Sequence, residues 1–240
     1  MDTAIVSGVG AINGMGAQLC LRFAKLGLHV FAASRTQANL DAVVAEIKAQ
    51  GGSATAVVAD ATDEATTMRL FKQARTVGKI SLAIYNSGNN TPGRVEEMTA
   101  AYFETSWRVC CFGGFLFGRE AVKHMKKDGG GTLLFTGASA SLRGRPNFAA
   151  FNSSKGALRN LANAMAKEYG EDLIHVGHVI IDGPIDGNTI RTRYPGYAEK
   201  MGEHGLISID AIVDCYEFLY KQPRAGWSFE IDARTAIENW

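Results

Sequence analysis

Short apolar runs alternate along this chain with longer segments in which apolar residues recur every three or four positions. The short runs predict strands buried on both faces, because such strands are apolar almost without interruption. They are Ala4–Ser7, His29–Ser34, Ala54–Ala59, Ser81–Asn86, Thr132–Thr136 and His175–Ile181. The longer segments predict helices at Gly16–Lys25, Gln37–Gln50, Ala65–Val77, Tyr102–Met125 and Leu158–Glu168. Strands that alternate with helices imply a parallel sheet, so the pattern predicts a doubly wound α/β fold.

The rest of the chain adds a tail and no second domain. The segment Gly226–Ile231 predicts a final strand, and Trp240 predicts docking against this subunit or a neighbouring one. No linker, repeat or low-complexity stretch divides the 240 residues, so we expect a single domain over residues 1–240.

Composition and charge narrow the choice of partners. A formal net charge of +1 gives no reason to expect a nucleic acid or an acidic membrane surface. No apolar run reaches the roughly 20 residues that span a bilayer. The first predicted strand begins too close to Met1 to leave room for a signal peptide. The cysteines show no metal-ligand spacing, so we expect reduced thiols, no metal and a cytoplasmic protein. They are Cys20, Cys110, Cys111 and Cys215.

A glycine-rich turn, Ser7–Gly16, joins the first predicted strand to the first predicted helix. Glycines at such a turn let backbone N–H groups approach a pyrophosphate at the N-terminus of the helix. The turn therefore predicts a dinucleotide site, and a purely structural turn is the alternative interpretation. The predicted contacts are Gly8, Gly10, Asn13, Gly14, Met15 and Gly16.

Ser34 and Arg35 end the second predicted strand, where dinucleotide folds that prefer NAD usually carry an acidic residue. No acid occupies positions 30 to 35. An arginine at this place can form charge-assisted hydrogen bonds with the 2′-phosphate of NADP. We therefore predict NADP over NAD as the cofactor, and a solvated arginine at a strand end is the alternative.

Three more strand ends carry short polar or glycine-containing motifs. Asp60-Ala61-Thr62-Asp63 follows the third strand, Tyr85-Asn86-Ser87-Gly88 the fourth and Gly183-Pro184-Ile185 the sixth. Their order, together with Phe151-Asn-Ser-Ser-Lys155, resembles the short-chain dehydrogenase/reductase family over nearly the whole chain. The resemblance implies a Rossmann-like fold with a nucleotide across the carboxyl ends of the strands. It also implies cofactor contacts from Asp60, Ala61, Asn86, Ser87, Gly88, Lys155, Gly183, Pro184 and Ile185.

The same resemblance locates the four catalytic positions of the family. Its lysine, which holds the nicotinamide ribose and lowers the pKa of a catalytic tyrosine, matches Lys155. The tyrosine, which is the general acid/base, falls at Phe151. The serine that polarises the substrate carbonyl falls at Ala138, and the asparagine of the proton relay falls at Cys110. Only the lysine keeps its polar function, since phenylalanine can neither donate nor accept a proton.

The loss of the tyrosine raises the question of a replacement proton donor. Ser139, beside the position of the missing serine, is one candidate, and Lys155 is another if burial depresses its pKa. General acid catalysis contributes about 10²–10⁴-fold, so its loss would slow a reductase without forbidding hydride transfer. The remaining candidates are Ser141, Thr136, Tyr85, Tyr194 and Tyr197.

Residues and resemblance together predict an NADP(H)-dependent oxidoreductase that acts on a carbonyl or alcohol through an atypical active site. The alternative is a catalytically weak or inactive NAD(P)-binding protein, either a sensor or a partner subunit. An apolar ligand end is expected beside Phe151, Ala138 and Cys110. Family members form dimers and tetramers through two long helices, here those containing Tyr102–Met125 and Phe151–Glu168, so the resemblance implies a homodimer or homotetramer.

The segment 184–206 corresponds to the substrate lid of the family. Its cationic residues, Arg191, Arg193 and Lys200, suggest either an anionic ligand or an exposed charged helix.

Overall fold

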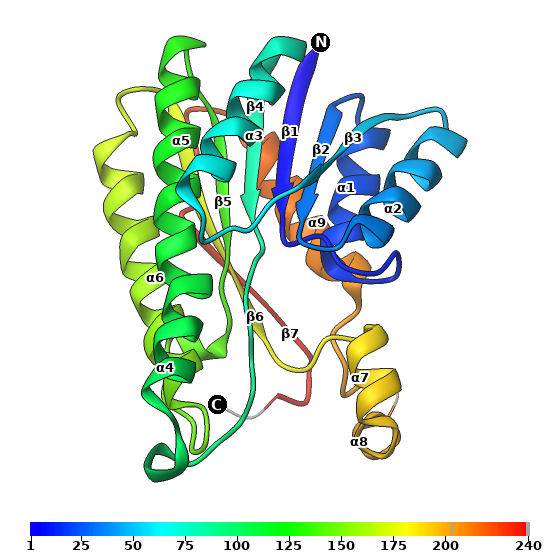
Figure 1. Cartoon of the computed structure of the whole chain (residues 1–240), viewed down its shortest axis with the longest axis vertical. Helices are drawn as coiled ribbons and strands as arrows, with labels where there is room; N and C mark the ends of the chain where they lie inside the picture. The colour runs from blue at the N-terminus through cyan, green and yellow to red at the C-terminus, as the bar shows by residue number, and fades with distance from the viewer. Residues whose placement is uncertain (203, 239–240) are drawn as a thin grey trace.

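The computed structural model describes residues 1–202 and 204–238, apart from the side chains of Thr189 and Arg193. Within these residues a seven-stranded parallel sheet runs in the order β3-β2-β1-β4-β5-β6-β7 (Figure 1). This confirms the predicted doubly wound α/β fold. The predicted docking of Trp240 lies outside the described residues. The strands are β1 (Asp2–Ser7), β2 (His29–Ser34), β3 (Ser53–Val58), β4 (Lys79–Tyr85), β5 (Gly131–Thr136), β6 (Ile174–Asp182) and β7 (Glu230–Arg234).

Helices cover both faces of the sheet. One face carries α1 (Met15–Lys25), α2 (Gln37–Ala49) and α9 (Ile209–Lys221). The other carries α3 (Glu64–Val77), α5 (Gly113–Lys127) and α6 (Ala149–Glu168). Successive residues of a strand point to opposite faces, so Ala4 and Val6 of β1 join the first core and Ile5 joins the second. Burial on both faces explains why the strands appear in the sequence as near-continuous apolar runs.

The predicted helix Tyr102–Met125 is interrupted near its middle. Helix α4 (Ala100–Trp107) passes into a π-helical turn, η2 (Arg108–Phe112), before α5 begins at Gly113. Such a turn widens the helix and re-aims the side chains around it, and it occurs frequently at functional sites. Hydrophobic spacing alone does not reveal it, because apolar residues continue through the turn.

The C-terminal third differs from the prediction in two respects. The bounds predicted for the last strand, Gly226–Ile231, are wrong, since β7 spans Glu230–Arg234. Trp227 stacks on His175 with ring centroids 5.0 Å apart, and the ladder with β6 starts only at Glu230. The amphipathic helix α9 was not predicted, although its apolar face closes one of the two cores.

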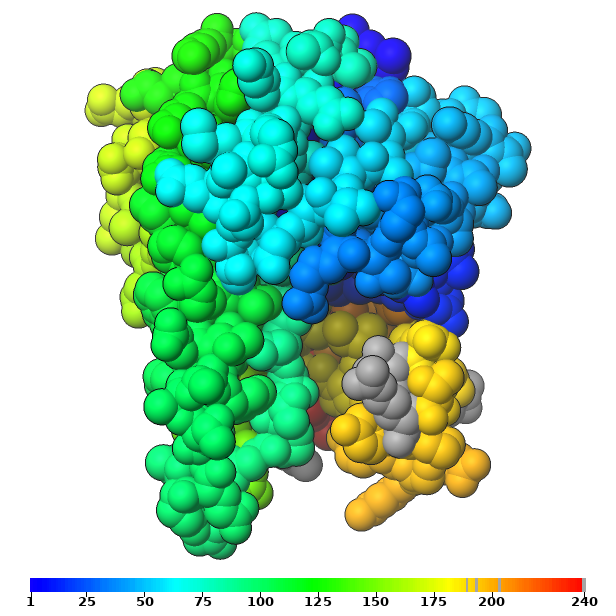
Figure 2. Space-filling model, in the orientation of Figure 1, coloured from blue at the N-terminus to red at the C-terminus, as the bar shows by residue number. Residues whose placement is uncertain are grey.

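Two short helices, α7 (Asn188–Arg193) and α8 (Pro195–Met201), lie in the segment 184–206, beyond the carboxyl ends of the strands (Figure 1). Figure 2 shows the surface hollowed between this segment, in yellow and orange, and the α4 region, in green. In the described part of the chain no helix is both long and apolar enough to cross a membrane.

Candidate active site

A cleft of about 460 Å³ lies at the carboxyl ends of the first four strands. The strand order reverses between β1 and β4, and ligands of open α/β sheets bind at such a switch point. The walls come from the carboxyl ends of β1, β2, β3 and β4 with the segments that follow them, and from α4 and η2. They are Ser7, Gly8, Val9, Gly10, Ser34, Arg35, Thr36, Asn39, Ala59, Asp60, Ala61, Thr62, Asn86, Ser87, Gly88, Thr105, Arg108 and Val109.

The glycine-rich turn brings backbone against backbone. Gly8 has a φ of +89°, and a Cβ on it would lie 2.6 Å from the amide nitrogen of Ser87. A Cβ on Gly16 would lie 2.4 Å from the carbonyl oxygen of Gly8. A Cβ on Gly10 would meet nothing within 4 Å, so at this position the backbone is open to a ligand.

The first helix leaves its N-terminus free for an anion. Gly14 is the N-cap of α1 and offers no side-chain cap, and no acidic residue lies in the first turn. The unpaired N–H groups and the helix dipole therefore favour a negative group at this end. This arrangement fits the pyrophosphate of a dinucleotide.

Nine of the seventeen predicted cofactor contacts lie on the cleft wall, and eight do not. Those on the wall are Gly8, Gly10, Ser34, Arg35, Asp60, Ala61, Asn86, Ser87 and Gly88. Those off it are Asn13, Gly14, Met15, Gly16, Lys155, Gly183, Pro184 and Ile185. Asn13 instead approaches the segment 184–206, with its Nδ2 3.5 Å from Asn188 Oδ1, and Ile185 forms a bridge with Ile207.

Asn86 ties three strand ends together beneath the cleft. Its Nδ2 donates to the carbonyl oxygen of Gly8 at 3.0 Å, and its Oδ1 accepts from Thr136 Oγ1 at 3.0 Å. The hydroxyls of Ser7 and Ser87 lie 3.0 Å apart. These bonds join the ends of β1, β4 and β5, so the cleft wall is fixed before a ligand arrives.

Lys155 is buried among groups from three elements. Its Nζ donates to the carbonyl oxygen of Thr136 at 2.7 Å and lies 5.8 Å from the ring centroid of Phe151. A Cβ on Gly88 would lie 3.5 Å from this Nζ and 3.9 Å from Cys110 Sγ, so both groups face the same glycine. Burial lowers the pKa of the Lys155 ammonium, which makes it a better proton donor near neutral pH.

The π-turn carries Cys110 into this cluster. Its buried Sγ lies 3.5 Å from Asn89 Oδ1, which also accepts a hydrogen bond from Ser106. The Tyr85 hydroxyl donates to the carbonyl oxygen of Val109 at 2.5 Å and thereby holds the turn to the end of β4. Burial raises the pKa of Tyr85. Tyr85 is therefore engaged in structure and does not offer its proton to a substrate.

Ala138 follows β5 and precedes a short 3₁₀ turn, η3 (Ser139–Ser141). Its N–H donates to Ser141 Oγ at 3.2 Å, which occupies that hydroxyl. The Thr136 hydroxyl is occupied as well, by Asn86 at 3.0 Å and by Tyr216 at 2.6 Å. Ser139 is half-buried, and no hydrogen bond is recorded for its hydroxyl within the described residues. It remains the serine available to a ligand.

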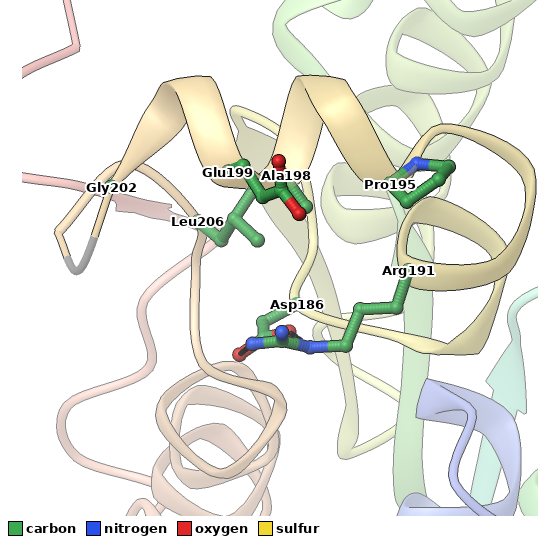
Figure 3. Close-up of a pocket in the computed structure, with 7 residues that line it drawn as sticks. All are labelled: Asp186, Arg191, Pro195, Ala198, Glu199, Gly202 and Leu206. Carbon is green, nitrogen blue, oxygen red and sulfur yellow. Dashed lines mark hydrogen bonds and ion pairs between the residues drawn. The ribbon is translucent and has the colours of Figure 1, made fainter.

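A second cavity, of about 540 Å³, lies within the segment 184–206 (Figure 3). Arg191 reaches across its floor to Asp186, with Nη2 2.8 Å from Oδ2, while Glu199 and Leu206 lie on the opposite side. Arg191 is therefore already neutralised by a neighbouring carboxylate. Tyr194 and Tyr197 are exposed on this segment.

The described residues contain no group of three or more His, Cys, Asp or Glu side chains that could hold a metal ion. All four cysteines are free thiols. The polar groups gathered at the strand ends suit a nucleotide, and the buried ammonium of Lys155 lies beside them.

Comparisons with known proteins identify the family of the chain and agree with its fold. A family model described as short chain dehydrogenase matches residues 3–194. Versicolorin reductase 1 of Aspergillus parasiticus is 33% identical over 180 residues, which are 73% of this chain and 67% of that protein. The chain spans about two thirds of the length of this and similar fungal reductases.

Two solved structures superpose over most of the chain. A short-chain dehydrogenase from Rhodopseudomonas palustris matches with a TM-score of 0.84 and 35% identity over 97% of this chain and 98% of that one. A 7α-hydroxysteroid dehydrogenase complexed with NADH and 7-oxo glycochenodeoxycholic acid matches with a TM-score of 0.88 and 27% identity, over 97% of this chain and 92% of that one.

Proposed function

The chain belongs to the short-chain dehydrogenase family, and from this premise we propose that it is an NADP(H)-dependent oxidoreductase of a carbonyl or alcohol substrate. The family implies a nicotinamide cofactor. The observation that carries the proposal is the buried ammonium of Lys155, placed beside Gly88 and Cys110 next to a cleft that fits a dinucleotide.

The preference for NADP rests on Arg35. This arginine is exposed on the cleft wall, and no carboxylate within the described residues pairs with it, which suits it to a 2′-phosphate. One structural neighbour was solved with NADH, so the family does not decide between the two cofactors. Tighter binding of NADH than of NADPH by this protein would overturn the preference.

The atypical part of the proposal concerns the proton. We propose that Phe151, Ala138 and Cys110 occupy the positions of the catalytic tyrosine, serine and asparagine of the family. When bound, the nicotinamide supplies a hydride to the carbonyl carbon. Lys155 Nζ, whose pKa is lowered by burial, gives a proton to the carbonyl oxygen and regains one from solvent. Ser139 can orient the carbonyl by a hydrogen bond.

The side chains at the three substituted positions favour a substrate with an apolar end. Phe151 presents a ring, Ala138 a methyl group and Cys110 a weakly polar thiol. The names of the relatives, which include a trihydroxynaphthalene reductase and a hydroxysteroid dehydrogenase, agree with ring-containing substrates.

A second function is favoured by one observation. Of the candidate replacement hydroxyls, those of Tyr85, Thr136 and Ser141 are taken by protein partners. A protein that binds NAD(P) with little or no turnover, as a sensor or partner subunit, would need no free hydroxyl there.

The deciding measurement is NADPH consumption with a broad panel of carbonyl compounds. It compares the native protein with the triple variant Phe151→Tyr, Ala138→Ser, Cys110→Asn and with Lys155→Met. Turnover by the native protein, lost in Lys155→Met, supports the relocated proton donor. Turnover by the triple variant alone, about 10²-fold or more above the native rate, favours the binding protein.

We further propose that the protein is a homodimer or homotetramer. Phe103, Trp107 and Phe115 are each about 40% exposed on α4 and α5, and gathered aromatic side chains often mark interfaces. Light scattering of the native protein and of Phe115→Glu tests this, and a native monomer at micromolar concentration would overturn it. The free thiols support a reducing compartment, which is the cytoplasmic location that we propose.

A further inference from the structure

Arg108 is a cleft residue that neither the motifs nor the family pattern identified. It belongs to the π-turn η2, next to Val109, and it lines the cleft together with Thr105 and with Thr62 from the turn after β3. The start of α5 packs directly on that turn, since a Cβ on Gly113 would lie 2.7 Å from the carbonyl oxygen of Ala61. The π-turn thus delivers a second arginine, besides Arg35, to the cleft wall.

The guanidinium of Arg108 is held on one side by an aromatic stack. Its Cζ lies 5.0 Å from the ring centroid of Phe112, and Phe112 stacks on Trp107 with centroids 5.8 Å apart. A guanidinium is planar and stacks on flat rings, which an ammonium does not. Arg108 therefore reaches the cleft with part of its orientation already fixed.

Arg108 forms no ion pair with a carboxylate in the described part of the chain. Within residues 1–202 and 204–238 no ion pair or hydrogen bond is recorded for it, whereas Arg22, Arg75 and Arg119 each pair with an acid. A planar cation left without an acid on a cleft wall is suited to a flat, electron-rich ligand.

The geometry of the cleft indicates which part of a dinucleotide would lie beside Arg108. The N-terminus of α1 and the glycine-rich turn suit the pyrophosphate at the centre. Lys155 and Cys110 lie on the side of β5, where the reacting end belongs. The other end of the ligand must then extend along β2 and β3, between Arg35 and the turn of Asp60.

We propose that Arg108 stacks its guanidinium on the adenine base of the cofactor and closes the cleft over it. Arg35 faces the ribose and its 2′-phosphate, so the two arginines divide the adenosine end between base and phosphate. The proposal rests on the proposed function only in requiring a nicotinamide adenine dinucleotide, and it holds for NADPH and NADH alike. It makes Arg108 a binding residue with no part in the chemistry.

The experiment measures dissociation constants of NADPH, NADH, AMP and reduced nicotinamide mononucleotide. The proteins are the native chain, Arg108→Ala, Arg108→Lys, Arg35→Ala and the control Arg69→Ala, an exposed arginine of α3 outside the cleft. Arg108→Ala is expected to weaken NADPH, NADH and AMP by the same factor, about tenfold. It should leave the mononucleotide unchanged. Arg108→Lys should remain weak, because it keeps the charge and loses the plane, and Arg35→Ala should weaken NADPH alone.

Each contrary result has a distinct meaning. Full rescue by Arg108→Lys, a loss confined to NADPH, or unchanged binding by Arg108→Ala would overturn the stacking of Arg108 while leaving the proposed function intact. A native protein that binds none of the three adenine-containing probes would overturn both. Thermal unfolding of each variant checks that losses of affinity arise in folded protein.

Discussion

The nucleotide cleft and the cluster around Lys155 adjoin each other at one edge of the sheet, yet they consist of different kinds of chemical groups. The cleft is made of glycine backbone, strand-end polar groups and two arginines that lack acidic partners in the described chain. The cluster holds one ammonium beside a phenyl ring, a thiol and a backbone carbonyl. Polar groups for binding are abundant, whereas polar groups for proton transfer are scarce.

Under the proposed function, binding and chemistry depend on different parts of the fold. Close backbone approaches such as that of Gly16 to Gly8 are tied to the packing of β1, α1 and β4, so they cannot change without disturbing the core. Phe151 and Ala138 lie on a helix and a loop that only border the site. They can exchange polar for apolar side chains at little cost to the fold.

Among the variants considered, Gly16→Ala should have the largest effect, and it disturbs the nucleotide cleft. Its Cβ would lie 2.4 Å from the carbonyl oxygen of Gly8, so two backbone segments must separate. We expect a loss of about 3 kcal/mol in the free energy of unfolding, measured by urea denaturation, and loss of nucleotide binding. In the control, Gly10→Ala, the Cβ meets no atom within 4 Å, so stability should change by less than about 1 kcal/mol. Equal stability of the two variants would contradict the packing described for the turn.

His178 lies within the core near Lys155, and its titration tests how burial there affects stability. It is fully buried, with Nδ1 3.0 Å from Glu230 Oε2, and burial lowers its pKa from 6.5 to about 4. Its Nε2 has no hydrogen-bond partner in the described chain and faces Gly137. Below pH 6.5 His178 becomes protonated in the unfolded chain but stays neutral in the folded one. The stabilisation that is present above pH 6.5 is therefore lost as the pH falls toward 4.

The expected loss from His178 between pH 7 and pH 5 is about 2 kcal/mol. Urea denaturation at the two pH values measures it. His178→Gln removes the titrating ring and should flatten the pH dependence by that amount. Parallel pH dependences of the native protein and the variant would show that His178 is not responsible.

Lys155→Met should give the smallest change in the free energy of unfolding, and the change should be stabilising. Burial disfavours the charged form of Lys155, so an apolar side chain of similar length should raise the free energy of unfolding by about 1 kcal/mol at pH 7. Lys167→Met, at an exposed position of the same helix, is the matched control and should stay within about 0.5 kcal/mol. A destabilised Lys155→Met would mean that the bond from Nζ to Thr136 is chiefly structural.

Much of the fold followed from local patterns. The strand predicted at His29–Ser34 matches β2, and the helix predicted at Gln37–Gln50 matches α2 to within one residue. Periodicity fails where contacts across the fold decide the conformation. The π-turn Arg108–Phe112 is an example, since Tyr85 fixes it from another strand.

The candidate site was predictable to a similar extent. Motifs after the strands located Gly8, Arg35, Asp60 and Asn86 on the cleft, because the carboxyl ends of parallel strands meet at one edge. No motif indicated Arg108, since its place on the wall depends on the π-turn. The partners of the candidate hydroxyls could not be predicted either, because they lie far along the chain. Tyr85 is separated from Val109 by 24 positions, and Thr136 from Tyr216 by 80.

The sequence by itself determined the alternation of strands and helices, the glycine-rich turn, the motif order and the lack of a tyrosine at position 151. These are local features, because the spacing and the type of neighbouring residues are enough to define them. The tertiary structure alone decided that Lys155 is buried with a lowered pKa, that the hydroxyls of Tyr85, Thr136 and Ser141 are occupied, and that Arg108 lines the cleft. Burial and hydrogen bonding arise between residues far apart in the chain, and only folding brings them together.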